Sequence, residues 1–193
     1  RGDNVRHTFD EPNYKWNSAY DLFWKDKHTH IDVYGYYPYA NPESIEDYQF
    51  EVQKDQSTAT EDGEMGGYEA SDFLWGKVSD VAPTTSIIRL PLAHRMSNAR
   101  VTLIQGSGFA DGEWANTKKI VLTANVARKA SINLADGTVK VAGSVENTAT
   151  IPSRVGDEWR TIVIPQTVAA GTTLFSITIG GVPYKFAKNE ALT

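Results

Sequence analysis

Alternation of apolar and polar positions is the strongest signal along the chain, and it predicts β-strands. Residues 120–126 alternate strictly, with four apolar side chains on one face, and residues 130–134 alternate in the same way. Residues 161–164 form a continuous β-branched run, which is typical of a strand buried on both faces. The apolar positions that we expect to face a core include Val101, Leu103, Leu122, Ile132, Ile162 and Ile164.

Two pairs of these runs have the turn chemistry of β-hairpins. Asp136-Gly137 separates residues 130–134 from residues 138–141, and a glycine in such a turn adopts positive φ without steric cost. Gly180-Gly181 separates residues 174–179 from residues 182–186 in a second hairpin. Pro183 has no N–H to donate, so we expect the strand at 182–186 to lie at a sheet edge.

Helix signals are weak by comparison. We expect only short turns at Glu43–Tyr48 and at Glu69–Trp75, the second capped by Ser71. Neither segment has the length or periodicity of a stable helix. Many short strands separated by Gly, Pro, Asn and Asp predict an all-β sandwich architecture.

The two halves of the chain differ in composition. Residues 1–50 hold 12 of the 21 aromatic residues, and the second half is richer in Val, Ile, Thr and Ala. A polar, proline-containing stretch at 78–86 separates them. We therefore predict two domains, residues 1–86 and residues 87–193.

Charge and motif content narrow the function classes. The 193-residue chain has 19 basic and 24 acidic side chains, a net charge of −5, which argues against nucleic acid as a partner. It has no cysteine, so disulfides and thiolate metal sites are excluded. No apolar run approaches the ~20 residues that span a bilayer. Nucleophile-elbow, zincin and P-loop motifs are absent from the sequence, so we expect no catalytic, cofactor or metal site.

His28 and His30 are the only pair of histidines spaced to share a strand face. A metal site would need a third ligand, and no spacing in the sequence points to one. Exposed polar side chains are the better interpretation. A carboxylate pair with hydrolase chemistry stays open, but nothing in the sequence singles one out.

An aromatic band at 31–39 is more informative. Alternation places Ile31, Val33, Gly35 and Tyr37 on a face that suits a core, and Asp32, Tyr34 and Tyr36 on the other. The second face, with two tryptophans nearby in sequence, could stack on sugars or on a partner protein. The alternative is that these rings pack under a covering loop. The candidate contact residues are Trp16, Trp24, Tyr34 and Tyr36.

Five segments, in order, resemble motifs of the fimbrillin family, the type V pilins of Gram-negative gut and oral anaerobes. The first resembles an "aYYPY" strand, and the others resemble a loop, an "SDLLWA" segment, a strand with a His-x-(Met/Leu)-Ser core, and a "VPQTV" element. They lie at residues 33–39, 55–58, 68–75, 90–101 and 163–168.

The resemblance implies two transthyretin-like β-sandwich domains in tandem, without catalysis or cofactor. It also implies export as a lipoprotein to the outer membrane and assembly with other fimbrial subunits. The chain lacks the family's lipobox cysteine and its final "G-K-x-Y-x-Y-x-I-x-V" strand. We therefore expect a fragment or clipped form, with an incomplete domain at 1–86, a domain at 87–193 lacking its last strand, and membrane attachment only through a lipid anchor absent from this chain.

A sheet without its last strand exposes unpaired backbone groups that can accept a strand from another chain. The candidate accepting edge is Val182, Tyr184 and Phe186. Two functions follow from the resemblance and the aromatic band. The first is a non-enzymatic structural and adhesive subunit of a fimbria; the second is an outer-surface module that binds a host glycan or protein and does not polymerise.

Overall fold

The computed structural model describes residues 3–61, 64–110, 121–142 and 150–192, and this part of the chain is almost entirely β-structure. Its helical elements are the 3-10 turn η1 (Glu11–Asn13) and the four-residue helix α1 (Gly67–Ala70). The all-β prediction is therefore confirmed. The strands are β1 (His7–Asp10), β2 (Lys15–Ser18), β3 (Ile31–Tyr37), β4 (Tyr48–Glu51), β5 (Leu74–Val81), β6 (Ala93–His94), β7 (Ser97–Thr102), β8 (Val121–Ala124), β9 (Lys129–Asn133), β10 (Thr138–Val141), β11 (Ser153–Val155), β12 (Glu158–Val163), β13 (Thr173–Ile179) and β14 (Val182–Ala187).

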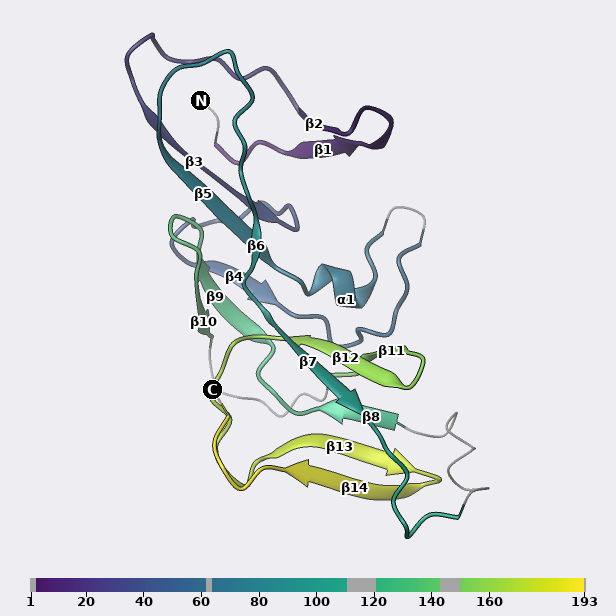
Figure 1. Ribbon diagram of the computed structural model, residues 1–193. Helices are drawn as coiled ribbons and strands as arrows, with labels where there is room; N and C mark the ends of the chain where they lie inside the picture. Colours follow the sequence, from purple (N-terminus) through teal and green to yellow (C-terminus); the bar gives the residue numbers. More distant parts are fainter. Residues whose placement is uncertain (1–2, 62–63, 111–120, 143–149, 193) are drawn as a thin grey trace.

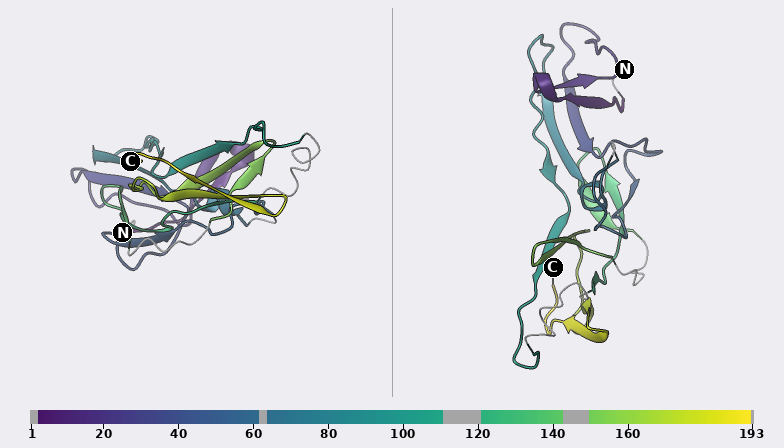
Figure 2. Two further views of the ribbon diagram at one scale, coloured as in Figure 1. Left: turned by 90° about the horizontal axis from the view of Figure 1, so that it is seen from below. Right: turned by 90° about the vertical axis from the view of Figure 1, so that its right-hand side faces the viewer.

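The strands form small antiparallel sheets along an elongated molecule (Figures 1 and 2). The β1–β2 hairpin lies near one end and the β13–β14 hairpin near the other. Between them are three-stranded sheets in the orders β3-β5-β6, β10-β9-β4 and β11-β12-β7, and β8 completes the terminal sheet in the order β14-β13-β8.

Both predicted hairpins are confirmed. Asn133 lies opposite Thr138 across the β9–β10 turn, and Gly137 there has a φ of +74°. Ile179 lies opposite Val182 across the β13–β14 turn, where both glycines have positive φ.

The predicted helical turns are wrong in detail. Ser71 follows the C-terminal end of α1 instead of starting a helix; its hydroxyl donates to the carbonyl of Gly67 at 2.6 Å and accepts from the N–H of Gln53 at 2.9 Å. Residues 43–47 are not helical, because the Ser44 hydroxyl accepts from the backbone N–H groups two and three residues later. This side-chain turn leads directly into β4.

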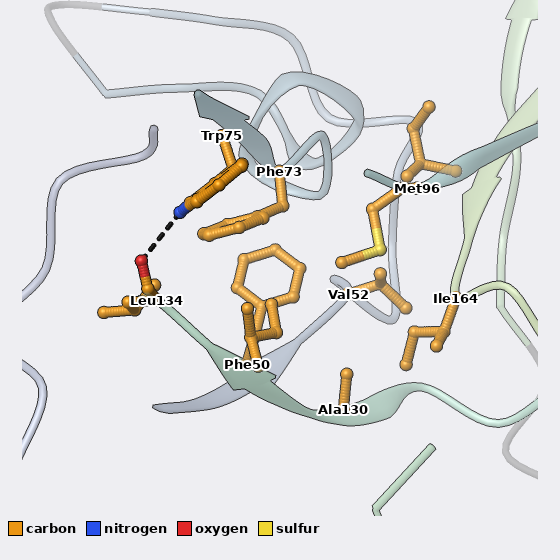
Figure 3. Packing of buried hydrophobic residues seen from close by; sticks show 10 residues of the cluster. Phe50, Val52, Phe73, Trp75, Met96, Ala130, Leu134 and Ile164 are labelled. Atoms are coloured by element: carbon orange, nitrogen blue, oxygen red, sulfur yellow. Dashed lines mark hydrogen bonds between the residues drawn. The ribbon is translucent and has the colours of Figure 1, made fainter. Parts of the chain in front are cut away.

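The main core lies where the sheets β10-β9-β4, β11-β12-β7 and β3-β5-β6 meet (Figure 3). Phe50 on β4 lies opposite Ala130 on β9, so residues from both sides of the predicted boundary at 86/87 share one sheet and one core. The boundary itself stays a prediction. The buried residues of this first cluster are Phe50, Val52, Phe73, Trp75, Met96, Ala130, Ile132, Leu134, Ile162 and Ile164.

β12 separates this first cluster from a second. Ile162 belongs to the first cluster, whereas Trp159 on the opposite face belongs to the second, with Ala124, Val126 and Phe175. Burial on both faces is what the β-branched run predicted, and Thr161 is only 1% exposed.

Five of the six predicted core positions fall into these two clusters. Ile132, Ile162 and Ile164 are buried in the first, as expected. Val101 and Leu103 are partly buried against the second. The side chain of Leu122 lies outside the described residues.

The expected core-facing position of Ile31 on β3 is wrong, and Tyr36 follows the alternative in which its ring packs within the fold. Ile31 is 42% exposed, whereas Tyr36 packs against the first cluster. The register between β3 and β5 shifts between Ile31 and Val33, which breaks the two-residue alternation at Ile31. From Val33 onward the pairing is continuous. Tyr36 is covered because Tyr48 and Phe73 pack against its ring.

Candidate functional site

β14 is the outer strand of its sheet in the part of the chain that the structure describes. It pairs with β13 along its length, and β13 pairs with β8 on its other side. Every residue of β14 is exposed. Its outer edge therefore offers backbone groups to a further strand.

An apolar row runs along β14. Val182, Tyr184 and Phe186 are 52%, 39% and 46% exposed, and their two-residue spacing places them on one face. They lie opposite Ile179, Ile177 and Phe175, which belong to or pack against the second core cluster. Directly opposite residues project to the same face of a sheet. The row is thus an extension of the second core that the chain leaves half uncovered.

Two ring contacts position this row. The Phe186 ring lies 6.3 Å from that of Phe175, and the Tyr184 ring lies 5.7 Å from that of Phe109. Pro183 lies opposite Thr178 and has no N–H, so at that position only the carbonyl can bond to an added strand.

Trp24 and Tyr36 have contacts that serve the fold. The Trp24 indole N–H donates to the carbonyl of Thr84 at 2.8 Å. The Tyr36 hydroxyl donates to the carbonyl of Ala40 at 2.9 Å, and its ring stacks on Phe73 at 6.1 Å. Burial, with a smaller contribution from nearby Tyr48, raises the pKa of Tyr36 to about 12.

Trp16 and Tyr34 are more open. Tyr34 on β3 lies opposite Lys77 and is 38% exposed. Trp16 on β2 is 60% exposed, with its ring 5.2 Å from that of Phe9. Across the described ranges, no ring contact joins Trp16 to Trp24, Tyr34 or Tyr36. The structure thus does not gather the four candidate aromatics into one stack.

The histidine pair does not form a metal site in the described part of the chain. His30 Nδ1 lies 2.7 Å from a carboxylate oxygen of Asp80. The Asp26 carboxylate instead accepts from the backbone N–H groups of His28 and Thr29 and from the Thr29 hydroxyl. These bonds lower the pKa of Asp26, and the bond from the Thr29 side chain has the largest effect. No group of three or more His, Asp or Glu side chains there has a metal-binding arrangement. Nor does any helix within the described ranges have the length and apolar character to span a membrane.

A sequence profile described as fimbrillin-like matches residues 1–193, the whole chain. The chain belongs to the fimbrillin-like family. The recognition made from the five sequence motifs is therefore confirmed. No curated protein is similar enough in sequence to count as a match.

Three crystal structures share the fold of this fimbrillin-like chain, each described as a candidate cell adhesion protein. The first, from Bacteroides uniformis, is 18% identical with a TM-score of 0.67; the alignment covers 92% of this chain and 69% of that one. The second, from Bacteroides thetaiotaomicron, is 14% identical with a TM-score of 0.57, covering 97% and 70%. The third, from Bacteroides ovatus, is 12% identical with a TM-score of 0.61, covering 92% and 66%. At these identities the likeness concerns the fold.

Sequence reasoning missed two exposed aromatics of the fimbrillin-like chain. Phe9 and Tyr14, 44% and 84% exposed, flank the turn between β1 and β2 and contact each other at 6.5 Å. A usable signal was present, because Pro12-Asn13 lies between short runs that each carry an aromatic residue.

Proposed function

We propose that this chain is a non-enzymatic, adhesive structural subunit of a surface fimbria that binds a neighbouring subunit by strand addition at β14. Membership of the fimbrillin-like family supports the surface and adhesive role. The observation that carries the assembly step is the apolar row of Val182, Tyr184 and Phe186 at the outer edge of a sheet.

Strand addition follows from the chemistry of that edge. An incoming strand would bond to the outer backbone groups of β14, which supplies affinity. Its alternate side chains would lie beside the apolar row and cover the second core. The same proposal includes two transthyretin-like units at residues 1–86 and 87–193, and lipoprotein export to the outer membrane.

A charged substitution in the row tests assembly directly. Lysine on an edge strand opposes pairing with another chain, so Tyr184→Lys should abolish incorporation of the full-length protein into fibres seen by electron microscopy. Val155→Lys is the matched control, since Val155 is 54% exposed on the outer strand β11 of another sheet. Equal incorporation of both variants would refute assembly through β14.

A second function, a surface module that binds a ligand without polymerising, is favoured by the exposed aromatic residues of the β1–β2 hairpin. Absence of fibres from the full-length protein, with ligand binding retained, would select this function over the first.

A further inference from the structure

The β1–β2 hairpin carries three exposed aromatic rings on a small surface. Phe9 lies opposite Trp16, which places both side chains on one face. Their rings are 5.2 Å apart and inclined by 51°, and the Tyr14 ring meets that of Phe9 edge-on at 6.5 Å. The three tilted rings leave much of their surface exposed to solvent. Phe9, Tyr14 and Trp16 are here called the aromatic cradle.

No other strand pairs with this hairpin in the described part of the chain. It is held at its base, where Asn4 donates to the carbonyl of Ala40 at 2.9 Å and the Arg6 guanidinium lies 5.7 Å from the centre of the Tyr39 ring. Figure 1 shows the two strands beside the β3–β5 ribbon, with their turn directed away from it. A two-stranded hairpin by itself is marginally stable in water, and the cross-strand pair of Phe9 and Trp16 contributes to its stability.

The backbone of Tyr14 is a second, independent observation. Its φ of +49° and ψ of +44° are left-handed, a region that disfavours a bulky residue. The turn is fixed by Asp10, whose carboxylate accepts from the amides of Asn13 at 2.9 Å and Asn17 at 3.4 Å. The pKa of Asp10 is lowered, and the hydrogen bond from the Asn13 amide is the largest cause. Tyr14 is nevertheless 84% exposed, and strained backbone of this kind clusters at binding sites.

The size of the aromatic cradle indicates what kind of ligand it fits. Exposed fractions of 44%, 84% and 60% leave roughly 400 Å² of aromatic surface uncovered. A stable protein partner needs about 800 Å² on each side, so the cradle is about half the required size. It matches one or two sugar rings, whose apolar faces present partly positive C–H groups to the negative faces of aromatic rings.

Polar groups beside the aromatic cradle indicate which ligands it can bind. His7, on the same face as Phe9, has Nδ1 3.0 Å from the carbonyl of Val5. A carbonyl can only accept, so Nδ1 carries the proton and Nε2 of the neutral ring is an acceptor. Ser18, opposite His7, donates its hydroxyl to the carbonyl of Tyr20 at 2.8 Å and keeps acceptor capacity on its oxygen. Acceptors beside an aromatic surface suit the hydroxyl donors of a sugar.

We propose that the aromatic cradle binds neutral pyranose glycans, stacking the sugar on Trp16 and Tyr14 and accepting hydroxyl hydrogen bonds at His7 and Ser18. This inference supplies the ligand class for the adhesive role proposed above, and it does not depend on assembly through β14.

The test is binding of the 193-residue chain to an array of immobilised neutral gluco-, galacto- and mannopyranose oligosaccharides, followed by NMR titration with the best binder. Trp16→Ala should lower affinity at least tenfold. Phe23→Ala, which removes a ring that is 87% exposed outside the cradle, should leave affinity unchanged. Saturable shifts should fall on hairpin amides.

Tyr14→Gly separates binding from folding. Glycine relieves the left-handed strain, so amide exchange in the hairpin should be unchanged or slower, while glycan affinity falls several-fold. The inference is overturned if no glycan on the array binds, or if Trp16→Ala and Phe23→Ala bind equally well. Peptide binding at β14, measured on the same samples, distinguishes failure of this site from failure of strand addition.

Discussion

The indole Nε1 of Trp75 donates a hydrogen bond to the backbone carbonyl of Leu134 at 2.8 Å, inside the first core cluster (Figure 3). Trp75 lies on β5 and Leu134 directly follows β9. The two residues come from opposite sides of the 78–86 stretch, so this bond joins the two halves of the chain within a buried core.

Trp75→Phe should destabilise the protein, because it leaves the buried Leu134 carbonyl without this donor. The cost should be about 1–3 kcal/mol, measured as the free energy of unfolding in urea. Trp16→Phe, at a ring that is 60% exposed, should change stability by less than about 0.5 kcal/mol. Equal effects would show that the Trp75 bond contributes nothing specific.

Gly137 and Gly171 form a matched pair for separating backbone strain from packing. Both have positive φ, +74° and +77°, but a Cβ on Gly137 would lie 2.5 Å from the Trp75 ring, whereas one on Gly171 would meet nothing within 4 Å. Gly171→Ala should cost about 1–2 kcal/mol from the backbone alone. Gly137→Ala should cost about 1–3 kcal/mol more, since the buried ring must move. Similar unfolding free energies for both would contradict the close approach.

The fully buried side chain of Gln56 hydrogen-bonds to the backbone of Ile162 as the backbone of a neighbouring strand would. Its amide donates to the Ile162 carbonyl and accepts from the Ile162 N–H, both at 2.8 Å. Gln56→Leu removes both partners and should cost about 1–3 kcal/mol for each backbone group left unsatisfied. Gln49→Leu, at an exposed glutamine on β4, is the control. A change below about 1 kcal/mol for Gln56→Leu would refute this role.

Tyr36 should make stability depend on alkaline pH. Its folded-state pKa of about 12 lies above the ordinary value of 10.0, mainly through burial, so the folded state prefers the protonated phenol. Its contribution is complete below pH 10 and is lost as the pH rises toward 12. Urea midpoints between pH 8 and pH 11.5 should fall more steeply for the wild-type protein than for Tyr36→Phe. Parallel curves would contradict the shift.

The parts of the fold that could be predicted from the amino-acid sequence are local ones. The turns at Gly137 and at Gly180-Gly181 lie within a few residues of the strands they join, so turn chemistry and alternation suffice to predict both hairpins. The pairing of β4 with β9 is different, because Phe50 and Ala130 are far apart in sequence. A single sequence has no local signal for such a contact, and so the core shared by the two halves was not foreseen.

The candidate site was predicted in the same uneven way. Pro183 indicated an edge strand, and β14 is the outer strand of its sheet. Tyr36 follows the alternative that its ring packs within the fold, because Phe73 and Tyr48, which are not its neighbours in sequence, lie against it. Tyr14 was passed over because only the folded turn shows its left-handed backbone.

Strand addition at β14 is tested most directly by calorimetric titration of the 193-residue chain with the ten-residue peptide GKTYTYTITV, which follows the alternating pattern of the family's final strand. The control peptide has proline at alternate positions and cannot donate a full set of backbone hydrogen bonds. Saturable heat is expected for the first peptide only, with NMR shifts on β14 amides. Tyr184→Lys should weaken binding at least tenfold, and Val155→Lys should leave it unchanged. Absence of heat, or equal binding of the two peptides, would contradict strand addition at this edge.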